Sequence, residues 1–365
     1  VLVGGLAGDA LTTGNKNVAV GMFALSTEDA NAGNTAIGYA ALEQQNAGAD
    51  VYNTAVGYAT GSTITTGGYN TLMGGFTGDA LTTGADNVAI GYAALSSEDS
   101  HGKNVAIGNY ALQDQDAGAD AYNVAIGYNA GKEVSTGVQN TLIGGLAGDA
   151  FTTGTRNVSL GYLALSAEDT GSRNVAIGAE ALLVANNDAN NYNTAVGDSA
   201  GEAVSSGTQN TIIGGLAGDA LTTGDNNIII GYAAAASAVG VDNEITLGDA
   251  NISAFRCADQ SIAALSDGRD KSDVKDSGFG LDFIDSIRPV EFTWDFRPEN
   301  MSENKQGKKR VGFIAQELQE AMPNGENEIL DLVYDINENR IEAKYGNLVP
   351  ILVKAVQELS AKVKM

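Results

Sequence analysis

A short motif of one asparagine, three small or apolar residues and one glycine recurs along most of the chain and constrains its fold more than any other feature. The asparagines follow one another in steps of 17, 19, 17 and 17 residues, which together make a longer period of 70 residues. One unit of this length cannot bury an apolar face alone, whereas stacked copies can. The repeat therefore predicts a solenoid. The motif begins at Asn17, Asn34, Asn53, Asn70, Asn87, Asn104, Asn123, Asn140, Asn157, Asn174, Asn193, Asn210 and Asn227, with a looser last copy at Asn243.

Each motif is typical of a short strand, in which the first and third apolar residues share a face and the small middle residue points the other way. The segments between motifs are rich in Gly, Asp, Ser and Thr, which favour turns. We expect a parallel β-roll or β-solenoid with one unit per rung and a ladder of asparagine amides, whose 14 rungs would span about 67 Å. The small middle residues suit either close approach of chains or tight packing within one chain: Ala19, Ala36, Ala55 and Ala89. Steps of 17 residues are too short for the helix pairs of a helical solenoid.

Charge and composition exclude several functions. The net charge is −25, which argues against binding to nucleic acid and to an anionic membrane surface. No apolar run reaches the roughly 18 residues of a membrane span, so no membrane insertion is expected. The single cysteine, Cys257, and the single histidine, His101, exclude a disulfide framework and most Cys- or His-based sites. We therefore expect no cofactor and no metal.

Composition divides the chain near residue 260. Residues 1–260 carry 26 acidic and 6 basic residues, whereas all four prolines and the only tryptophan, Trp294, lie beyond them. We expect a repetitive β-roll shaft over 1–250, a linker over 251–265 and a small α/β domain over 266–365. In that domain the pattern predicts a helix over 281–287, a strand over 290–296 and a helix over 312–322 that stops at Pro323.

The last helix carries a heptad seam, with apolar residues spaced 3, 4, 3 and 4. This spacing is typical of a helix that pairs with copies of itself. A helix that packs on its own domain gives the same spacing, and five positions do not fix an oligomeric state. The seam consists of Val349, Leu352, Val356, Leu359 and Val363.

The N-x-A-I-G unit resembles the head repeats of trimeric autotransporter adhesins and similar repeats in phage tail fibres, over roughly residues 1–250. The autotransporter repeat is shorter than the 17 to 19 residues found here. The resemblance implies a homotrimeric roll with a buried axis.

The C-terminal part is similar to the intramolecular chaperone auto-processing domain of phage tail fibres and endosialidase tailspikes. The blocks SDGRDK, GLDFIDSIRPVEF, GFIAQELQEAMP and LVPILVKAVQEL occur in the order of that family. The resemblance implies a domain that trimerises, guides folding of the preceding shaft and then cuts itself off before the serine of an S-D-x-R-x-K motif.

Carried onto this chain, the resemblance places the scissile bond between Leu265 and Ser266, with Ser266 as nucleophile and Lys271 as general base. It gives Asp267 and Arg269 a supporting role in the loop. The chemistry is sound by itself, because a serine needs a base and a lysine whose pKa is lowered by burial can serve. Such an enzyme would turn over once and act on no external substrate.

A second lysine, Lys275, competes for the role of base. His101 belongs to the repeat region, which leaves a Ser-Lys dyad as the available pairing.

These features predict a structural and adhesive tail fibre protein in the virion, assembled in the host cytoplasm and exposed to the extracellular medium. The expected partners are two further copies of the chain, other virion tail proteins and a host surface receptor, either a glycan or an outer-membrane protein. Two alternatives remain: a tailspike depolymerase, which would need paired carboxylates in a groove, and a bacterial trimeric surface adhesin. Recurring tyrosines either stack on sugars or mark a structural position: Tyr39, Tyr58, Tyr92, Tyr128, Tyr162 and Tyr232.

Overall fold

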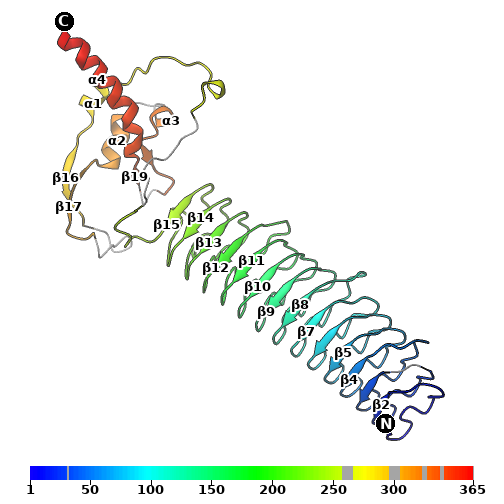
Figure 1. The fold of residues 1–365 in the computed structure, drawn as a ribbon. Helices are drawn as coiled ribbons and strands as arrows, with labels where there is room; N and C mark the ends of the chain where they lie inside the picture. The colour runs from blue at the N-terminus through cyan, green and yellow to red at the C-terminus, as the bar shows by residue number, and fades with distance from the viewer. Residues whose placement is uncertain (31–32, 257–265, 296–304, 323–326, 338–340, 365) are drawn as a thin grey trace. The chain divides into compact units, whose positions relative to one another are not determined.

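The repeat region folds into a parallel β-solenoid with one three-residue strand per rung, as expected (Figure 1). The computed structural model describes residues 1–30, 33–256, 266–295, 305–322, 327–337 and 341–364, which form two compact units, Val1–Asp249 and Ala250–Met365. In the first unit each strand pairs in parallel with the next along the chain. The strands are β1 (Leu2–Val3), β2 (Val18–Val20), β3 (Thr35–Ile37), β4 (Thr54–Val56), β5 (Thr71–Met73), β6 (Val88–Ile90), β7 (Val105–Ile107), β8 (Val124–Ile126), β9 (Thr141–Ile143), β10 (Val158–Leu160), β11 (Val175–Ile177), β12 (Thr194–Val196), β13 (Thr211–Ile213), β14 (Ile228–Ile230) and β15 (Ile245–Leu247).

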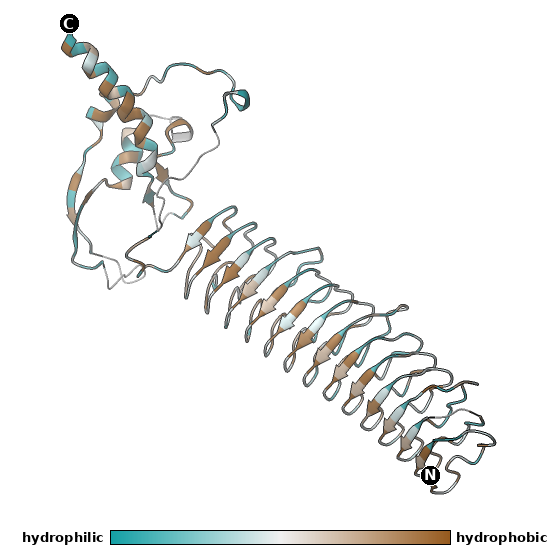
Figure 2. Cartoon of the chain, in the orientation of Figure 1, coloured by the Kyte–Doolittle hydropathy of each residue, from teal (hydrophilic) through white to brown (hydrophobic). Residues whose placement is uncertain are grey.

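In the three-residue strands β2–β14 the middle residue is buried inside the solenoid and the two flanking residues point outward. The middle residue is most often alanine, but larger apolar residues also fill this position: Leu72, Leu142, Ile212 and Ile229. Ala89 of β6 is fully buried, whereas its neighbours Val88 and Ile90 remain partly exposed. Of the two roles left open for the small residues, the structure shows packing within one chain. The interior is filled by these alanines and by leucines from the turns, such as Leu95. Figure 2 shows the consequence: apolar residues line the strands, and polar residues gather in the turns.

The asparagine ladder runs from side chain to backbone and is almost wholly buried. Each amide oxygen accepts a hydrogen bond from the backbone N–H of the asparagine one rung further on, at 2.8–3.2 Å. The amide nitrogen commonly donates to a glycine carbonyl, as Asn140 does to Gly154 at 2.8 Å. These bonds satisfy buried polar groups that would otherwise destabilise the interior. The last rung corrects the sequence analysis, because Glu244 and not Asn243 takes the ladder position.

The glycine that ends each strand lies against the backbone of the next rung. Gly74 has a φ of +135°, and a Cβ there would lie 2.4 Å from the carbonyl oxygen of Gly91. Its neighbour Gly75 has no positive φ, and its nearest obstacle is the Tyr92 ring at 3.6 Å. Only the first glycine of the pair is therefore required by the backbone.

We expect Gly74→Ala to lower the free energy of unfolding by about 1–3 kcal/mol, because it combines backbone strain with a clash between rungs. Thermal unfolding followed by circular dichroism measures the loss. Gly75→Ala is the matched control and should change stability by less than about 1 kcal/mol. Equal losses for the two variants would refute the close approach of the rungs.

A glutamate recurs every 70 residues at an interior position: Glu28, Glu98 and Glu168, each without exposed surface. One rung beyond Glu98, the same position holds Gln115, which is also buried. Burial raises the pKa of Glu98, against the opposing effect of the His101 backbone N–H, which donates to Glu98 Oε1 at 3.1 Å. The folded state therefore binds this proton more tightly than the unfolded state. Its stabilising effect is present below the ordinary glutamate pKa of 4.5 and is lost as pH rises through the raised value.

Glu98→Gln should accordingly stabilise the shaft at pH 7 by about 1 kcal/mol, or roughly 2–4 °C in Tm, and have little effect near pH 4. Calorimetry of the full chain at both pH values measures this. Glu133→Gln removes a carboxylate at an exposed position and is the control, which should change the free energy of unfolding by less than about 0.5 kcal/mol. A pH-independent effect of Glu98→Gln would refute the assignment.

The second unit is a small α/β domain with a separate core. That core is built by Phe283, Ile287, Leu318, Met322, Leu330, Leu332, Val333, Leu348 and Ile351. The first predicted helix is confirmed except for its last residue, and the predicted strand is confirmed only over Val290–Thr293. The second helix is also shorter than expected, because Gly312 ends a strand. The elements are η1 (Gly268–Asp270), α1 (Leu281–Ser286), β16 (Val290–Thr293) antiparallel to β17 (Lys309–Gly312), α2 (Ala315–Ala321), α3 (Asn327–Leu330), β18 (Val333–Tyr334) antiparallel to β19 (Glu342–Ala343), η3 (Tyr345–Asn347) and α4 (Leu348–Lys364).

Candidate functional site

The S-D-x-R-x-K motif forms a tight local turn. Asp267 caps the short helix η1, with its Oδ1 accepting the backbone N–H of Arg269 at 2.9 Å. The Arg269 guanidinium in turn donates to the Asp267 carboxylate, with Nε 3.0 Å from Oδ2. These hydrogen bonds from the Arg269 side chain hold the pKa of the Asp267 carboxyl below its ordinary value. Asp267 and Arg269 thus fix the shape of the loop.

This turn brings Ser266 and Lys271 together. Because η1 folds the chain back, Lys271 Nζ lies 2.6 Å from Ser266 Oγ, although the residues are five apart in sequence. That is the distance at which a base can take the proton of a serine nucleophile. Lys275 makes no hydrogen bond to Ser266 in the described part of the chain. Leu265, on the other side of the expected scissile bond, lies outside the described residues.

Both members of this pair are exposed in the single chain. A lysine functions as a base when it is removed from water, because desolvation favours its neutral form. The described part of the single chain supplies the geometry of a Ser-Lys dyad without the covering surface that such a mechanism requires.

Helix α4 uses two faces. Leu348, Ile351 and Ala355 are buried against their own unit, and Leu281 N–H of α1 donates to Glu358 Oε2 at 2.8 Å. The predicted heptad seam lies on another face and is exposed, with 45–79% of each residue's surface accessible to solvent. The face that packs on its own unit is therefore distinct from the seam, whose pairing with copies of the chain stays a prediction. We call the exposed seam, Val349, Leu352, Val356, Leu359 and Val363, the α4 stripe.

Comparison with known families decides what this unit resembles. Residues 266–325 match the family model Peptidase S74, the chaperone of endosialidase. The match begins at Ser266 itself and extends beyond α2. Searches of curated proteins and of solved structures returned no match. A chaperone-of-endosialidase segment that follows a parallel β-solenoid of about 14 turns along the chain fits a protein of the tail fibre or tailspike type.

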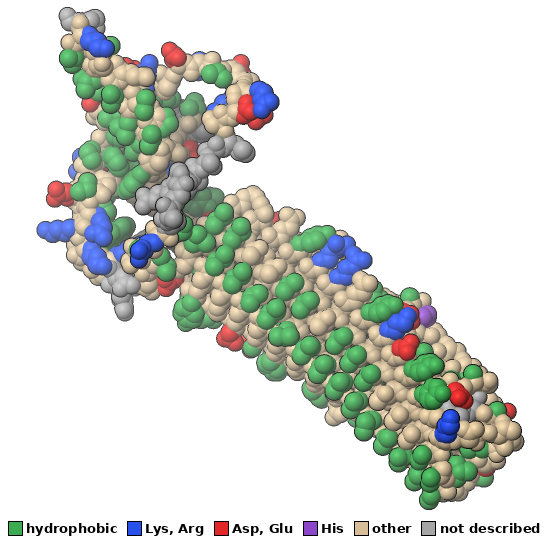
Figure 3. Space-filling model, viewed as in Figure 1, with side chains coloured by type: hydrophobic (Ala, Val, Ile, Leu, Met, Phe, Trp, Pro, Cys, Tyr) green, Lys and Arg blue, Asp and Glu red, His purple; other side chains and the backbone are tan. Residues whose placement is uncertain are grey.

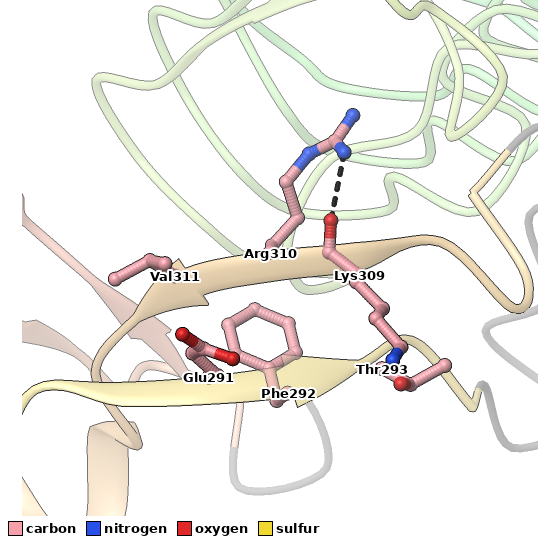
Figure 4. Close-up of a pocket in the computed structure, with 6 residues that line it drawn as sticks. All are labelled: Glu291, Phe292, Thr293, Lys309, Arg310 and Val311. Atoms are coloured by element: carbon pink, nitrogen blue, oxygen red, sulfur yellow. Dashed lines mark hydrogen bonds between the residues drawn. The ribbon is translucent and has the colours of Figure 1, made fainter.

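Two shallow hollows lie on the unit that carries the chaperone segment. The larger, about 550 Å³, follows the β16–β17 hairpin and is lined by Glu291, Phe292, Thr293, Lys309, Arg310 and Val311 (Figure 4). Glu291 is the one carboxylate among the lining residues that the structure describes, and these residues do not form the carboxylate pair of a glycosidase. The smaller, about 290 Å³, lies on the α4 stripe around Val356, Leu359 and Val363.

The outward face of the solenoid sheet is a further uncovered apolar surface. Strands β1–β15 contain no charged residue, and Figure 3 shows rows of hydrophobic side chains along this unit. None of the helices that the structure describes is long and apolar enough to cross a bilayer.

Four of the six recurring tyrosines belong to a longer aromatic ladder beside this face, whereas Tyr162 and Tyr232 are not members of it. Tyr39 and Tyr58 stack with ring centroids 5.1 Å apart, and further contacts extend the ladder in both directions. Three members were not predicted, because they stand one residue further along their rungs than the recurring tyrosines: Phe23, Phe76 and Tyr110. The sequence signal for them is an aromatic residue at the neighbouring repeat position. The ladder comprises Phe23, Tyr39, Tyr58, Phe76, Tyr92, Tyr110 and Tyr128.

One group of potential metal ligands occurs among the described residues. Glu98, Asp99 and His101 each offer a ligand atom within 4.8 Å of the others, and His101 Nδ1 lies 3.6 Å from Glu98 Oε1. No role was predicted for His101 from the sequence. In the third 70-residue copy Gly171 takes its place, so the group is not a repeated feature of the solenoid.

Proposed function

We propose that this chain is the shaft of a phage tail fibre with its own assembly chaperone, and that it works as a homotrimer. The observation that carries the proposal is the pair of apolar surfaces that one chain leaves uncovered, the sheet face of the solenoid and the α4 stripe. Monomeric proteins seldom expose contiguous apolar surface of this extent. Two further copies of the chain would cover both surfaces.

The chaperone solves a kinetic problem of assembly. Pairing three long β-solenoids is slow and exposes unpaired apolar surface to aggregation. Trimerisation through the α4 stripe raises the effective concentration of the shafts and aligns their rungs. Removal of the chaperone then leaves a shaft that is held together by a kinetic barrier to unfolding.

The cut follows from the dyad. Lys271 Nζ takes the proton from Ser266 Oγ, which attacks the carbonyl carbon of Leu265. The new C–O bond replaces the C–N bond to Ser266, whose nitrogen leaves as an amine after accepting the proton from Lys271. Water then hydrolyses the ester, which leaves a carboxylate on Leu265 and a free Ser266 hydroxyl. Covering by the assembled trimer would supply the dry environment that the exposed dyad lacks, so that only assembled chains are cut.

The fibre would project from the virion, join other tail proteins and contact a receptor on the host surface, either a glycan or an outer-membrane protein. The test is binding of the purified, fluorescently labelled protein to a panel of bacterial strains. We expect saturable binding to a subset of strains, and competition there with adsorption of phage. If the protein binds to none of the strains that phage carrying it can infect, an adhesive role is refuted and the chain is only a spacer within the fibre.

A further inference from the structure

The residue that precedes each ladder asparagine forms an exposed column along the solenoid. Four of the five basic residues of the shaft stand in this column, together with four tyrosines. Figure 3 shows the few basic side chains on the visible face of this unit following its length. The column contains Lys16, Lys103, Arg156, Arg173, Tyr52, Tyr69, Tyr122 and Tyr192.

Cation and ring pack together twice in the same way. Lys103 Nζ lies 5.3 Å from the centre of the Tyr122 ring, and the Arg173 guanidinium lies 5.4 Å from that of Tyr192, four rungs further on. The backbone here has a positive φ, +64° at Lys103 and +67° at Arg173, which favours glycine or asparagine. These side chains are exposed, so core packing does not explain why large residues stand at this position.

The second and third 70-residue copies differ in charge around this column. In the second copy Asp86 precedes Lys103, whose Nζ pairs with Asp120 at 2.5 Å. In the third copy Arg156 replaces Asp86 and Asn190 replaces Asp120.

The third copy therefore carries two arginines on neighbouring rungs of the column, and it lacks the two aspartates that the second copy has at the matching positions. Arg156 donates to Gln139 Oε1 at 2.9 Å and Arg173 to Asn190 Oδ1 at 3.0 Å. Neither forms an ion pair within the part of the chain that the structure describes. Two neighbouring unpaired cations on a strongly acidic shaft indicate an anionic partner from outside the chain.

We propose that Arg156, Arg173 and Tyr192 bind an acidic, carboxylate-bearing polysaccharide that runs along the solenoid. Arginine presents a planar fork that matches a carboxylate, and a tyrosine ring offers an apolar face to a sugar. The rung spacing of about 4.8 Å is close to the length of one sugar in an extended glycan, so successive side chains meet successive sugars. This inference rests on the proposed function, because it names the class of the host receptor.

The two copies supply matched variants for the test. Arg156→Asp with Asn190→Asp gives the third copy the residues that the second copy already carries at these positions, so the fold accommodates them. Asp86→Arg with Asp120→Asn makes the opposite change. Lys132→Gln removes a basic residue of the shaft outside the column and is the charge control. Binding of polygalacturonate, alginate and hyaluronate to the full chain is measured by calorimetry, with dextran as the neutral polysaccharide.

We expect at least one of the acidic polysaccharides to bind and dextran not to bind. The first variant should weaken binding about tenfold or more, the opposite variant should add a second site, and Lys132→Gln should change Kd by less than about threefold. Unchanged binding in the first variant, or binding of none of the three polyanions, would overturn the inference.

Sizing of the same variants separates this inference from the proposed function. If the arginine variant loses its oligomeric state, the column is a protein interface and the polysaccharide site is refuted. If the variant Arg156→Asp with Asn190→Asp still binds to cells as the wild type does, the proposed adhesive function is retained and the polysaccharide site is refuted.

Discussion

Ser266→Ala will remain a single full-length chain, whereas the wild-type protein will separate into fragments 1–265 and 266–365. The reason is the 2.6 Å approach of Lys271 Nζ to Ser266 Oγ, because without the hydroxyl no ester can form. A denaturing gel after heating, with intact mass and the N-terminal sequence of the smaller fragment, measures the effect. We expect loss of cleavage by at least about three orders of magnitude, as is usual when a nucleophile is removed.

Two lysine variants make this test specific. Lys271→Met should also stay whole, and Lys275→Met should be cut like the wild type, because Lys275 does not contact Ser266 in the described structure. Cleavage that depends on Lys275 and not on Lys271 would move the base to the second lysine. If the wild-type chain stays whole and forms a trimer, the prediction of self-cleavage is wrong and the C-terminal unit is a trimerisation domain that remains attached to the shaft.

Val356→Asp on α4 will convert the assembled protein into monomers. Val356 lies at the middle of the α4 stripe, beside the hollow it forms with Leu359 and Val363. A trimer would bring three carboxylates into one apolar interface, and burying each without a partner costs several kcal/mol. Light scattering of the purified variant should give the chain mass of 37.3 kDa.

Gln357→Asp is the control for this variant, since it adds the same carboxylate to the exposed neighbouring position. It should keep the oligomeric state of the wild type. An unchanged oligomer in Val356→Asp would show that α4 does not hold the copies together. The sheet face of the solenoid would then have to do so alone.

The solenoid could be predicted from the sequence because the spacing between successive asparagines gives the length of each rung directly. Identical spacing of the asparagines sets the register, and the structure pairs the strands accordingly, with Val88 opposite Val105. The direction of the faces could not be predicted. A strand with Val88 and Ile90 on one side and Ala89 on the other fits two arrangements, and in the structure the middle residue shares the interior with leucines from the turns. The position of Glu244 in the ladder could not be predicted either, because strand register and not residue type defines it.

The motif predicted that Ser266 and Lys271 lie close together, but it did not predict that both side chains are exposed to solvent. The spacing of Ser266 and Lys271 is short enough for one turn of η1 to join them. The separation of buried and exposed faces on α4 depends on packing against α1, which no local pattern contains. The exposure of Ser266 and Lys271 is likewise a property of the folded unit and not of the motif. The charge difference between Asp86 and Arg156 was visible in the sequence, but only the column geometry gives it a meaning.

The mass in solution of the full-length Ser266→Ala chain tests the account most directly, because this variant keeps shaft and chaperone joined. Sedimentation equilibrium should give three times the chain mass of 37.3 kDa, unchanged on dilution to nanomolar concentrations. A mass of one chain would contradict the account, since the sheet face and the α4 stripe would then be exposed to water in the working protein.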